Sequence, residues 1–134
     1  MATIRKEFDV PAPAPDVWRA LRDFGAVDRL AAGFVTACTL EEDGAVRRIT
    51  FFNGMEVRER LVSLEEEARR IVYTAEGGRA SHHNASAQVI ALGPQRCRFV
   101  WITDLLPDAI APAIGQMMER GAQAMQASLT PPAR

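Results

Sequence analysis

The sequence contains only two cysteines, which argues against a scaffold built on disulfides. Cys38 and Cys97 lie far apart in strand-like stretches and match no zinc-ligand spacing, so we expect free, partly buried thiols in a reducing compartment. The first residues become charged without the apolar stretch of a secretory signal. No apolar run approaches the roughly 20 residues of a membrane-spanning helix. We therefore expect a soluble, cytoplasmic protein without a membrane span.

No charge sign dominates the chain. Its 16 basic and 17 acidic residues give a formal net charge of −1 and are interspersed, so no basic block indicates a nucleic-acid partner. Hydrophobic residues make up 48% and charged residues 25% of the sequence, which is typical of a folded soluble domain. A length of 134 residues supports one hydrophobic core. We expect a single domain over 1–134, with a frayed tail from about residue 130 onwards.

Several catalytic and cofactor motifs are missing as well. The only histidines, His82 and His83, are adjacent, and in an extended segment their side chains point to opposite faces, which makes a shared metal site geometrically poor. No Ser-His-Asp order is evident, and no glycine-rich phosphate loop follows a strand, because Gly77-Gly78 is typical of a turn. We expect neither a metal nor a cofactor.

The hydrophobic pattern changes period along the chain. One strand-like segment is followed by two short helical patterns, six more strand-like segments and a long amphipathic helix. The expected strands cover residues 4–10, 34–40, 45–52, 57–64, 69–76, 83–92 and 96–106, and the expected helices cover 16–24, 27–32 and 108–129. Short turns between consecutive strands favour an antiparallel meander over parallel βαβ units. The predicted fold class is α+β, with a curved antiparallel sheet of about seven strands closed by the C-terminal helix over an apolar pocket.

The long C-terminal helix has one apolar face. This face repeats at steps of three or four residues and comprises Ile110, Ile114, Met117, Met118, Gly121, Ala122, Met125 and Leu129. The other side of the helix carries Gln116, Glu119, Arg120, Gln123 and Gln126. The methionines suit either a plain core or an adaptable pocket wall. Gly115 and Gly121 each cost roughly 1 kcal/mol relative to Ala within a helix, so either close packing or space for a ligand would explain them.

Several local signatures follow one another over nearly the whole chain. They are Val10-Pro11-Ala12 with Val17-Trp18 and Leu21, then Gly44-Ala45-Val46-Arg47, Asn53-Gly54, Val57 and Glu59-Arg60-Leu61, then Tyr73 with Glu76-Gly77, and finally Phe99-Val100-Trp101. With the element order, this set resembles the START/SRPBCC superfamily of helix-grip proteins, which includes birch-pollen-allergen-like proteins, and in particular its polyketide cyclase/dehydrase-like branch. The resemblance implies a helix-grip fold. Members bind lipids, hormones or polyketides, and only some catalyse cyclisation or dehydration, so the fold does not name the reaction.

The chain departs from this family pattern near the expected mouth of the pocket. Asp28-Arg29-Leu30 stands where similar sequences often carry a Trp after the second short helix. His82-His83 stands where they often carry an Asn-Tyr pair. Both differences bear on the choice of ligand.

Face parity predicts that Arg47 and Glu59 point inward from adjacent strands, because each shares its strand face with apolar residues. A three-residue loop, Asn53-Gly54-Met55, would place the two side chains diagonally across the hairpin and within reach of each other. The pair is then either a structural ion pair or a polar anchor. In the second case Arg47 holds a carboxylate or enolate oxygen of the ligand, and Glu59 orients the ligand or moves a proton.

The leading hypothesis is a protein that binds an apolar small molecule resembling a polyketide, a lipid or an aromatic metabolite. The expected ligand-binding residues are Arg47, Ile49, Phe51, Glu59, Tyr73, His83, Phe99, Trp101, Ile114, Met117, Met118, Gly121 and Met125. The alternative is a cyclase- or dehydrase-type enzyme in which Arg47, Glu59 and His83 act in acid–base catalysis. A partner-binding regulator and a homodimer also stay open.

Overall fold

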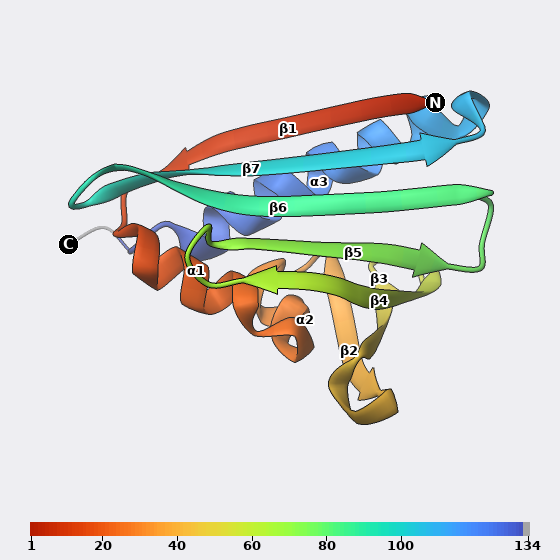
Figure 1. Cartoon of the computed structure of the whole chain (residues 1–134), viewed down its shortest axis with the longest axis horizontal. Helices are drawn as coiled ribbons and strands as arrows, with labels where there is room; N and C mark the ends of the chain where they lie inside the picture. Colours follow the sequence, from red (N-terminus) through yellow and green to blue (C-terminus); the bar gives the residue numbers. More distant parts are fainter. Residues whose placement is uncertain (133–134) are drawn as a thin grey trace.

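A curved sheet of seven strands and a long C-terminal helix make up most of the protein (Figure 1). This computed structural model describes residues 1–132. The strands are β1 (Ala2–Val10), β2 (Val35–Glu41), β3 (Val46–Phe51), β4 (Glu56–Glu65), β5 (Arg70–Glu76), β6 (His82–Gly93) and β7 (Arg96–Leu106), and the helices are α1 (Ala14–Arg22), α2 (Val27–Leu30) and α3 (Ala111–Leu129). The predicted α+β class, with two short helices after the first strand, is confirmed. Of the predicted frayed tail, residues 133 and 134 lie outside the described residues.

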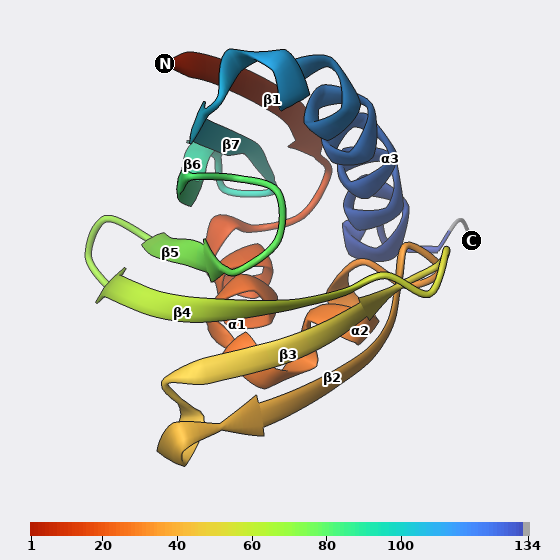
Figure 2. The same ribbon diagram turned by 90° about the vertical axis from the view of Figure 1, so that its right-hand side faces the viewer.

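All strand pairs are antiparallel, and the sheet order is β1-β7-β6-β5-β4-β3-β2. The meander predicted from the short turns therefore runs from β2 to β7, and β1 joins it at the edge of β7. The register shifts within the β2–β3, β4–β5 and β6–β7 pairs, and such bulges bend strands and increase their twist. The resulting curve is open on one side, where α3 lies along it and contacts β1 and α2 (Figure 2).

Proline and glycine account for the helix boundaries that differ from the prediction. α1 begins at Ala14, two residues early, because Pro15 occupies the first turn, where its missing N–H removes no helical hydrogen bond. α2 ends at Leu30 rather than residue 32, and Gly33 follows with a left-handed φ of +87°. Residues 108–110 form a separate 3₁₀ turn, so α3 begins at Ala111.

The hydrophobic core fills the space between the sheet and the helices. Phe99 of β7 is fully buried and stacks on Phe8 of β1 with the ring centroids 4.9 Å apart. α1 buries Trp18, whose indole N–H donates to Glu66 Oε1 at 2.8 Å. Arg22 donates to both oxygens of the same carboxylate, at 2.9 and 2.8 Å. Glu66 therefore connects α1 to the β4–β5 turn.

Neither cysteine forms a disulfide within the described part of the chain. Cys97 is buried and Cys38 is half-buried, and desolvation raises the pKa of both thiols. Both side chains therefore stay protonated at neutral pH, when a thiol is a weak nucleophile. The expectation of free, partly buried thiols is confirmed for the structure. None of the helices between residues 1 and 132 is long and apolar enough to cross a membrane.

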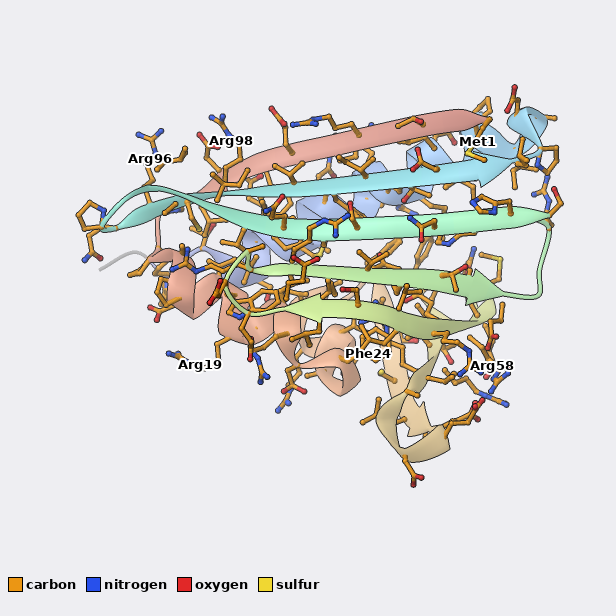
Figure 3. All side chains as sticks on the ribbon, viewed as in Figure 1. Met1, Arg19, Phe24, Arg58, Arg96 and Arg98 are labelled. Carbon is orange, nitrogen blue, oxygen red and sulfur yellow. The ribbon has the colours of Figure 1, made fainter. Side chains whose placement is uncertain are left out.

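Charged side chains cover the convex face of the sheet, where Arg58, Arg96 and Arg98 point away from the interior (Figure 3). Arg98 donates to Asp9 at 2.8 Å, and Arg58 donates to Glu41 at 2.8 Å. Because these groups are well exposed, each pair contributes little stability, about 0–1 kcal/mol. The convex face is a solvated surface, whereas the buried polar residues Arg47, Glu59 and Thr103 lie on the concave face.

Candidate functional site

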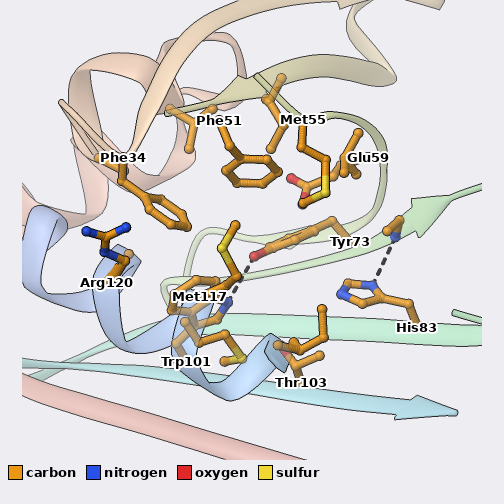
Figure 4. A pocket seen from close by; sticks show the side chains of 18 of the residues that line it. Phe34, Phe51, Met55, Glu59, Tyr73, His83, Trp101, Thr103, Met117 and Arg120 are labelled. Atoms are coloured by element: carbon orange, nitrogen blue, oxygen red, sulfur yellow. Dashed lines mark hydrogen bonds between the residues drawn. The ribbon is translucent and has the colours of Figure 1, made fainter. Parts of the chain in front are cut away.

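A cavity of about 600 Å³ lies between the concave face of the sheet and α3 (Figure 4). Most of its wall is apolar and comes from both layers. The structure places all the predicted ligand-binding residues on this wall: Arg47, Ile49, Phe51, Glu59, Tyr73, His83, Phe99, Trp101, Ile114, Met117, Met118, Gly121 and Met125. Their part in binding stays a prediction, because the location of a side chain does not show what it contacts in a complex.

Arg47 and Glu59 face each other directly across the β3–β4 hairpin, instead of diagonally as predicted. The Phe51 N–H donates to Met55 O at 2.8 Å, so the three-residue loop runs from Phe52 to Gly54 instead of 53–55. Gly54 takes a left-handed φ of +83° that this turn requires. Moving the loop by one residue changes the pairing by two, which keeps both side chains on the same face of the sheet.

The guanidinium of Arg47 is engaged on several sides. Arg47 Nε and Nη2 both lie 2.8 Å from Glu59 Oε1, and Nη1 donates to Phe24 O at 3.3 Å. Its carbon Cζ lies 4.1 Å from the centroid of the Phe24 ring and 4.9 Å from that of Tyr73, distances at which a cation is attracted to the ring. The side chains of Arg47 and Glu59 are only 6% and 10% exposed. The positive charge of Arg47 is thus matched by Glu59 before any ligand enters.

Tyr73 is a neutral hydrogen-bond donor inside the cavity. The indole N–H of Trp101 donates to Tyr73 Oη at 2.9 Å, which leaves the hydroxyl proton of Tyr73 for another acceptor. Burial raises the pKa of Tyr73 well above its usual range, and the charge of Glu59 adds to this effect. Tyr73 therefore keeps its proton at physiological pH and does not act as a phenolate.

The structure separates the two histidines as face parity predicted. His82 is exposed, whereas His83 lines the cavity. The backbone N–H of Ala75 donates to His83 Nδ1 at 3.0 Å, so the neutral ring carries its proton on Nε2. Nε2 points into the cavity (Figure 4). Burial lowers the pKa of His83, while Glu59 opposes this shift and His82 adds to it. At neutral pH, His83 thus offers one N–H to a ligand.

We expect acid to destabilise the fold through His83. Its pKa in the folded state lies below the ordinary 6.5, so the unfolded chain binds more protons as the pH falls below that value. The stabilising effect of neutral His83 is complete above pH 6.5 and is lost as the pH drops towards the folded pKa. Urea unfolding from about pH 7.5 to about pH 5 measures this slope, above the range in which carboxylates titrate.

His83→Asn should remove much of this pH slope, and the matched His82→Asn should keep it, because His82 is exposed. A slope that disappears in His82→Asn and persists in His83→Asn would contradict the assignment.

Sequence reasoning missed part of the cavity wall. Gln116 and Arg120 were predicted on the solvent side of the helix, yet both line the cavity. Arg120 lies with its Cζ 4.3 Å from the centroid of Phe52, across the gap between α3 and the β3–β4 loop. Phe34 was also missed, and its ring centroid lies 5.2 Å from that of Phe51. In the sequence, this aromatic cluster was indicated only by the positions of its phenylalanines: Phe34 directly precedes β2, Phe51 ends β3 and Phe52 follows it.

Close packing explains Gly121, one of the two reasons left open by the sequence. A Cβ atom at this position would lie 3.0 Å from Phe34 Cε2 and 3.1 Å from Trp101 Cζ3. The two rings thus approach the backbone of α3 more closely than an alanine would allow without a shift. The same argument does not hold for Gly115, where a Cβ would meet only Ile4 at an ordinary 3.9 Å.

The match with a known family covers residues 1–130, and its description is "Polyketide cyclase / dehydrase and lipid transport". This chain belongs to that family. Comparison with solved structures agrees with the helix-grip fold. Comparison with curated proteins found no significant match.

Three solved structures illustrate the similarity. A protein from Thermobifida fusca is 29% identical with a TM-score of 0.78, and the alignment covers 94% of this chain and 91% of that one. The di-domain ARO/CYC protein BexL from the BE-7585A biosynthetic pathway is 16% identical with a TM-score of 0.83, covering 96% and 46%. A START superfamily protein from Mycobacterium smegmatis is 15% identical with a TM-score of 0.73, covering 95% and 96%. At such identities the last two comparisons show the fold alone.

Nothing in the described residues is suited to hold a metal ion. Between residues 1 and 132, no group of three or more His, Cys, Asp or Glu side chains is arranged so that it could hold a metal ion. What the cavity provides is an apolar wall, one ion pair and a few neutral polar groups, a combination that suits binding or proton transfer.

Proposed function

We propose that this protein binds an apolar small molecule, resembling a polyketide, a lipid or an aromatic metabolite, in the cavity between the sheet and α3. The observation that carries the proposal is the cavity itself, whose volume of about 600 Å³ is typical of ligand sites. Membership of a family described by polyketide cyclase/dehydrase and lipid transport supports the same class of ligand.

The nature of the wall also supports an apolar ligand. Ile49, Ile71 and Phe51 line it from the sheet, and Met117 and Met118 line it from α3. Each methylene group that a ligand buries against such a wall contributes about 0.8 kcal/mol of binding free energy. Because methionine is unbranched and polarizable, the α3 side can adapt to ligands of different shape.

Native mass spectrometry of freshly purified protein, followed by solvent extraction, tests whether a ligand is already bound.

Naphthalene serves as a defined apolar probe in a thermal-shift or fluorescence titration, and we expect it to bind and to raise Tm. Met117→Trp should weaken this binding by at least about tenfold, because the indole occupies the cavity. The matched Gln123→Trp lies on the exposed side of α3 and should leave naphthalene binding unchanged. Protein that carries no extractable molecule and shows no shift with apolar probes would rule out the proposal.

An enzyme of the cyclase/dehydrase type is the second candidate, and one feature of the sheet favours it. The register aligns Glu59 with Ala75 of β5, and Ala75 lies beside His83 of β6. Glu59 and His83 thus flank a small alanine on the cavity side, and their backbones are about 10 Å apart, which is two strand spacings. A β-hydroxy ketone held between them could lose its α-proton to Glu59, and the protonated Glu59 could pass this proton to the departing hydroxyl, so that the products are an enone and water. His83 Nε2–H would donate a hydrogen bond to the ketone oxygen as negative charge develops on it.

The absorbance of the enone formed from a naphthyl β-hydroxy ketone measures this reaction. Glu59→Gln should slow it by about 10²-fold or more, since general base catalysis supplies that factor, while His82→Asn should not change it. Unchanged turnover in Glu59→Gln would remove Glu59 from the mechanism and with it this second candidate.

A further inference from the structure

Four polar side chains gather on one side of the cavity, and we refer to Glu59, Tyr73, His83 and Thr103 as the polar wall. Figure 4 shows Glu59, His83 and Thr103 on one side of the cavity, with Phe34 and Arg120 on the other. The sheet register explains this grouping. Tyr73 pairs with Ala85, and Ala85 pairs with Thr103, so Tyr73 and Thr103 flank one alanine, as Glu59 and His83 flank Ala75.

The polar wall has hydrogen-bonding capacity that the protein does not use. Thr103 is only 2% exposed, and its hydroxyl has no partner among residues 1–132. No side-chain nitrogen or oxygen that is sealed from solvent lacks a partner in the described chain, so this hydroxyl must open to the cavity. Glu59 accepts both Arg47 contacts on Oε1, which leaves Oε2 available. A ligand would therefore meet donors from Tyr73 and His83, an acceptor on Glu59 and a hydroxyl that can serve as either.

The polar wall carries no unmatched positive charge. The charge of Arg47 is matched by Glu59, and His83 presents a neutral ring. A carboxylate placed here would lose its water, would lie near Glu59 and would find no free cation, and burying an unpaired anion is costly. Arg79 and Arg120 also line the cavity, but both are exposed, where ion pairs contribute little.

We propose that the polar wall selects an uncharged ligand that carries a hydroxyl or carbonyl oxygen on its apolar body, and that it discriminates against carboxylates. This inference rests on the proposed function, since it names the chemical class that the cavity would accept. Thr103 and His83 are its specificity-determining residues. A hydroxylated aromatic molecule fits the combination of donors and acceptors, whereas a fatty-acid carboxylate does not.

Three probes that share the naphthalene ring system and differ in one substituent test the proposal by titration at neutral pH: naphthalene, 2-naphthol and 2-naphthoate. We expect 2-naphthol to bind at least about tenfold more tightly than 2-naphthoate, and more tightly than naphthalene. Thr103→Val keeps the shape of the side chain and should weaken 2-naphthol by about 2–10-fold, the range for one hydrogen bond, without weakening naphthalene. Thr39→Val, at an exposed position on β2, is the matched control and should change neither affinity.

The outcomes separate this inference from the proposed function. Failure of all three probes to bind would contradict the proposed function itself. Binding of naphthalene with 2-naphthoate equal to or tighter than 2-naphthol would overturn only the inference, and loss of that naphthoate binding in Arg120→Gln would show that the anion is held at Arg120 instead. Unchanged 2-naphthol affinity in Thr103→Val would likewise overturn the role of Thr103.

Discussion

Replacing Arg47 by Met is expected to lower the free energy of unfolding by about 3–5 kcal/mol, because it leaves the carboxylate of Glu59 buried without its cation. The side chains of both residues are nearly inaccessible to water, so solvent cannot take over the role of the guanidinium. The contact of Arg47 with the Phe24 ring and its bond to Phe24 O are lost at the same time. Urea unfolding monitored by tryptophan fluorescence measures the change.

Two variants make this result specific. Arg47→Met/Glu59→Leu removes both charges and should recover most of the loss, since replacing a buried ion pair by apolar side chains is often neutral. Arg48→Met removes the charge of the next residue on β3, which is half exposed and pairs with Glu41 on the surface. This variant should lower the free energy of unfolding by less than about 1 kcal/mol. If Arg47→Met were no more destabilising than Arg48→Met, the ion pair would not be buried in solution.

Phe99→Ala is expected to destabilise the protein by about 3–5 kcal/mol, the usual cost of removing a fully buried aromatic ring. The ring stacks on Phe8 and joins β1 to the core, although it also borders the cavity. The same variant enlarges the cavity, so the loss should be partly offset when naphthalene is added. Thermal and urea unfolding, with and without naphthalene, measure both effects.

Ile90→Ala on β6 is the control for this experiment, because Ile90 is 42% exposed and lies on the outer face of the sheet. We expect it to change stability by about 0.5 kcal/mol or less. A loss below about 1 kcal/mol in Phe99→Ala would mean that the surrounding residues collapse into the space, and the wall of the cavity would then be less rigid than the structure indicates.

Local patterns were sufficient for most of the fold. Alternating strands, turns such as Asn53-Gly54 and an amphipathic C-terminal helix each depend on residues that are close in sequence. Side-chain parity correctly placed Arg47 and Glu59 on one face, because parity survives a shift of two residues in register. The exact pairing was wrong, since it depends on which residue adopts the left-handed conformation of the turn. The structure assigns that role to Gly54 in a loop that begins one residue earlier.

The predicted polar face of α3 was wrong in part for a different reason. A helical pattern ranks positions by hydrophobicity, but Arg120 is long enough to reach across the gap and lie against Phe52. Phe52 belongs to a loop more than sixty residues earlier, and no pattern within the helix could reveal it. Because Arg120 reaches Phe52, the face of α3 that lines the cavity is wider than its apolar residues alone indicate.

The sequence by itself determined the α+β class, the order of the elements, the family and the inward direction of Arg47 and Glu59, because each of these rests on local periodicity or short motifs. Only the tertiary structure decided that Ala75 holds the His83 ring with Nε2 towards the cavity, that Trp101 donates to Tyr73, and that the Thr103 hydroxyl opens to the cavity. These facts depend on strand register and on the curvature introduced by bulges, which bring residues from β4 to β7 around one space. Such contacts between distant segments arise only when the whole sheet is formed, and they define the polar wall.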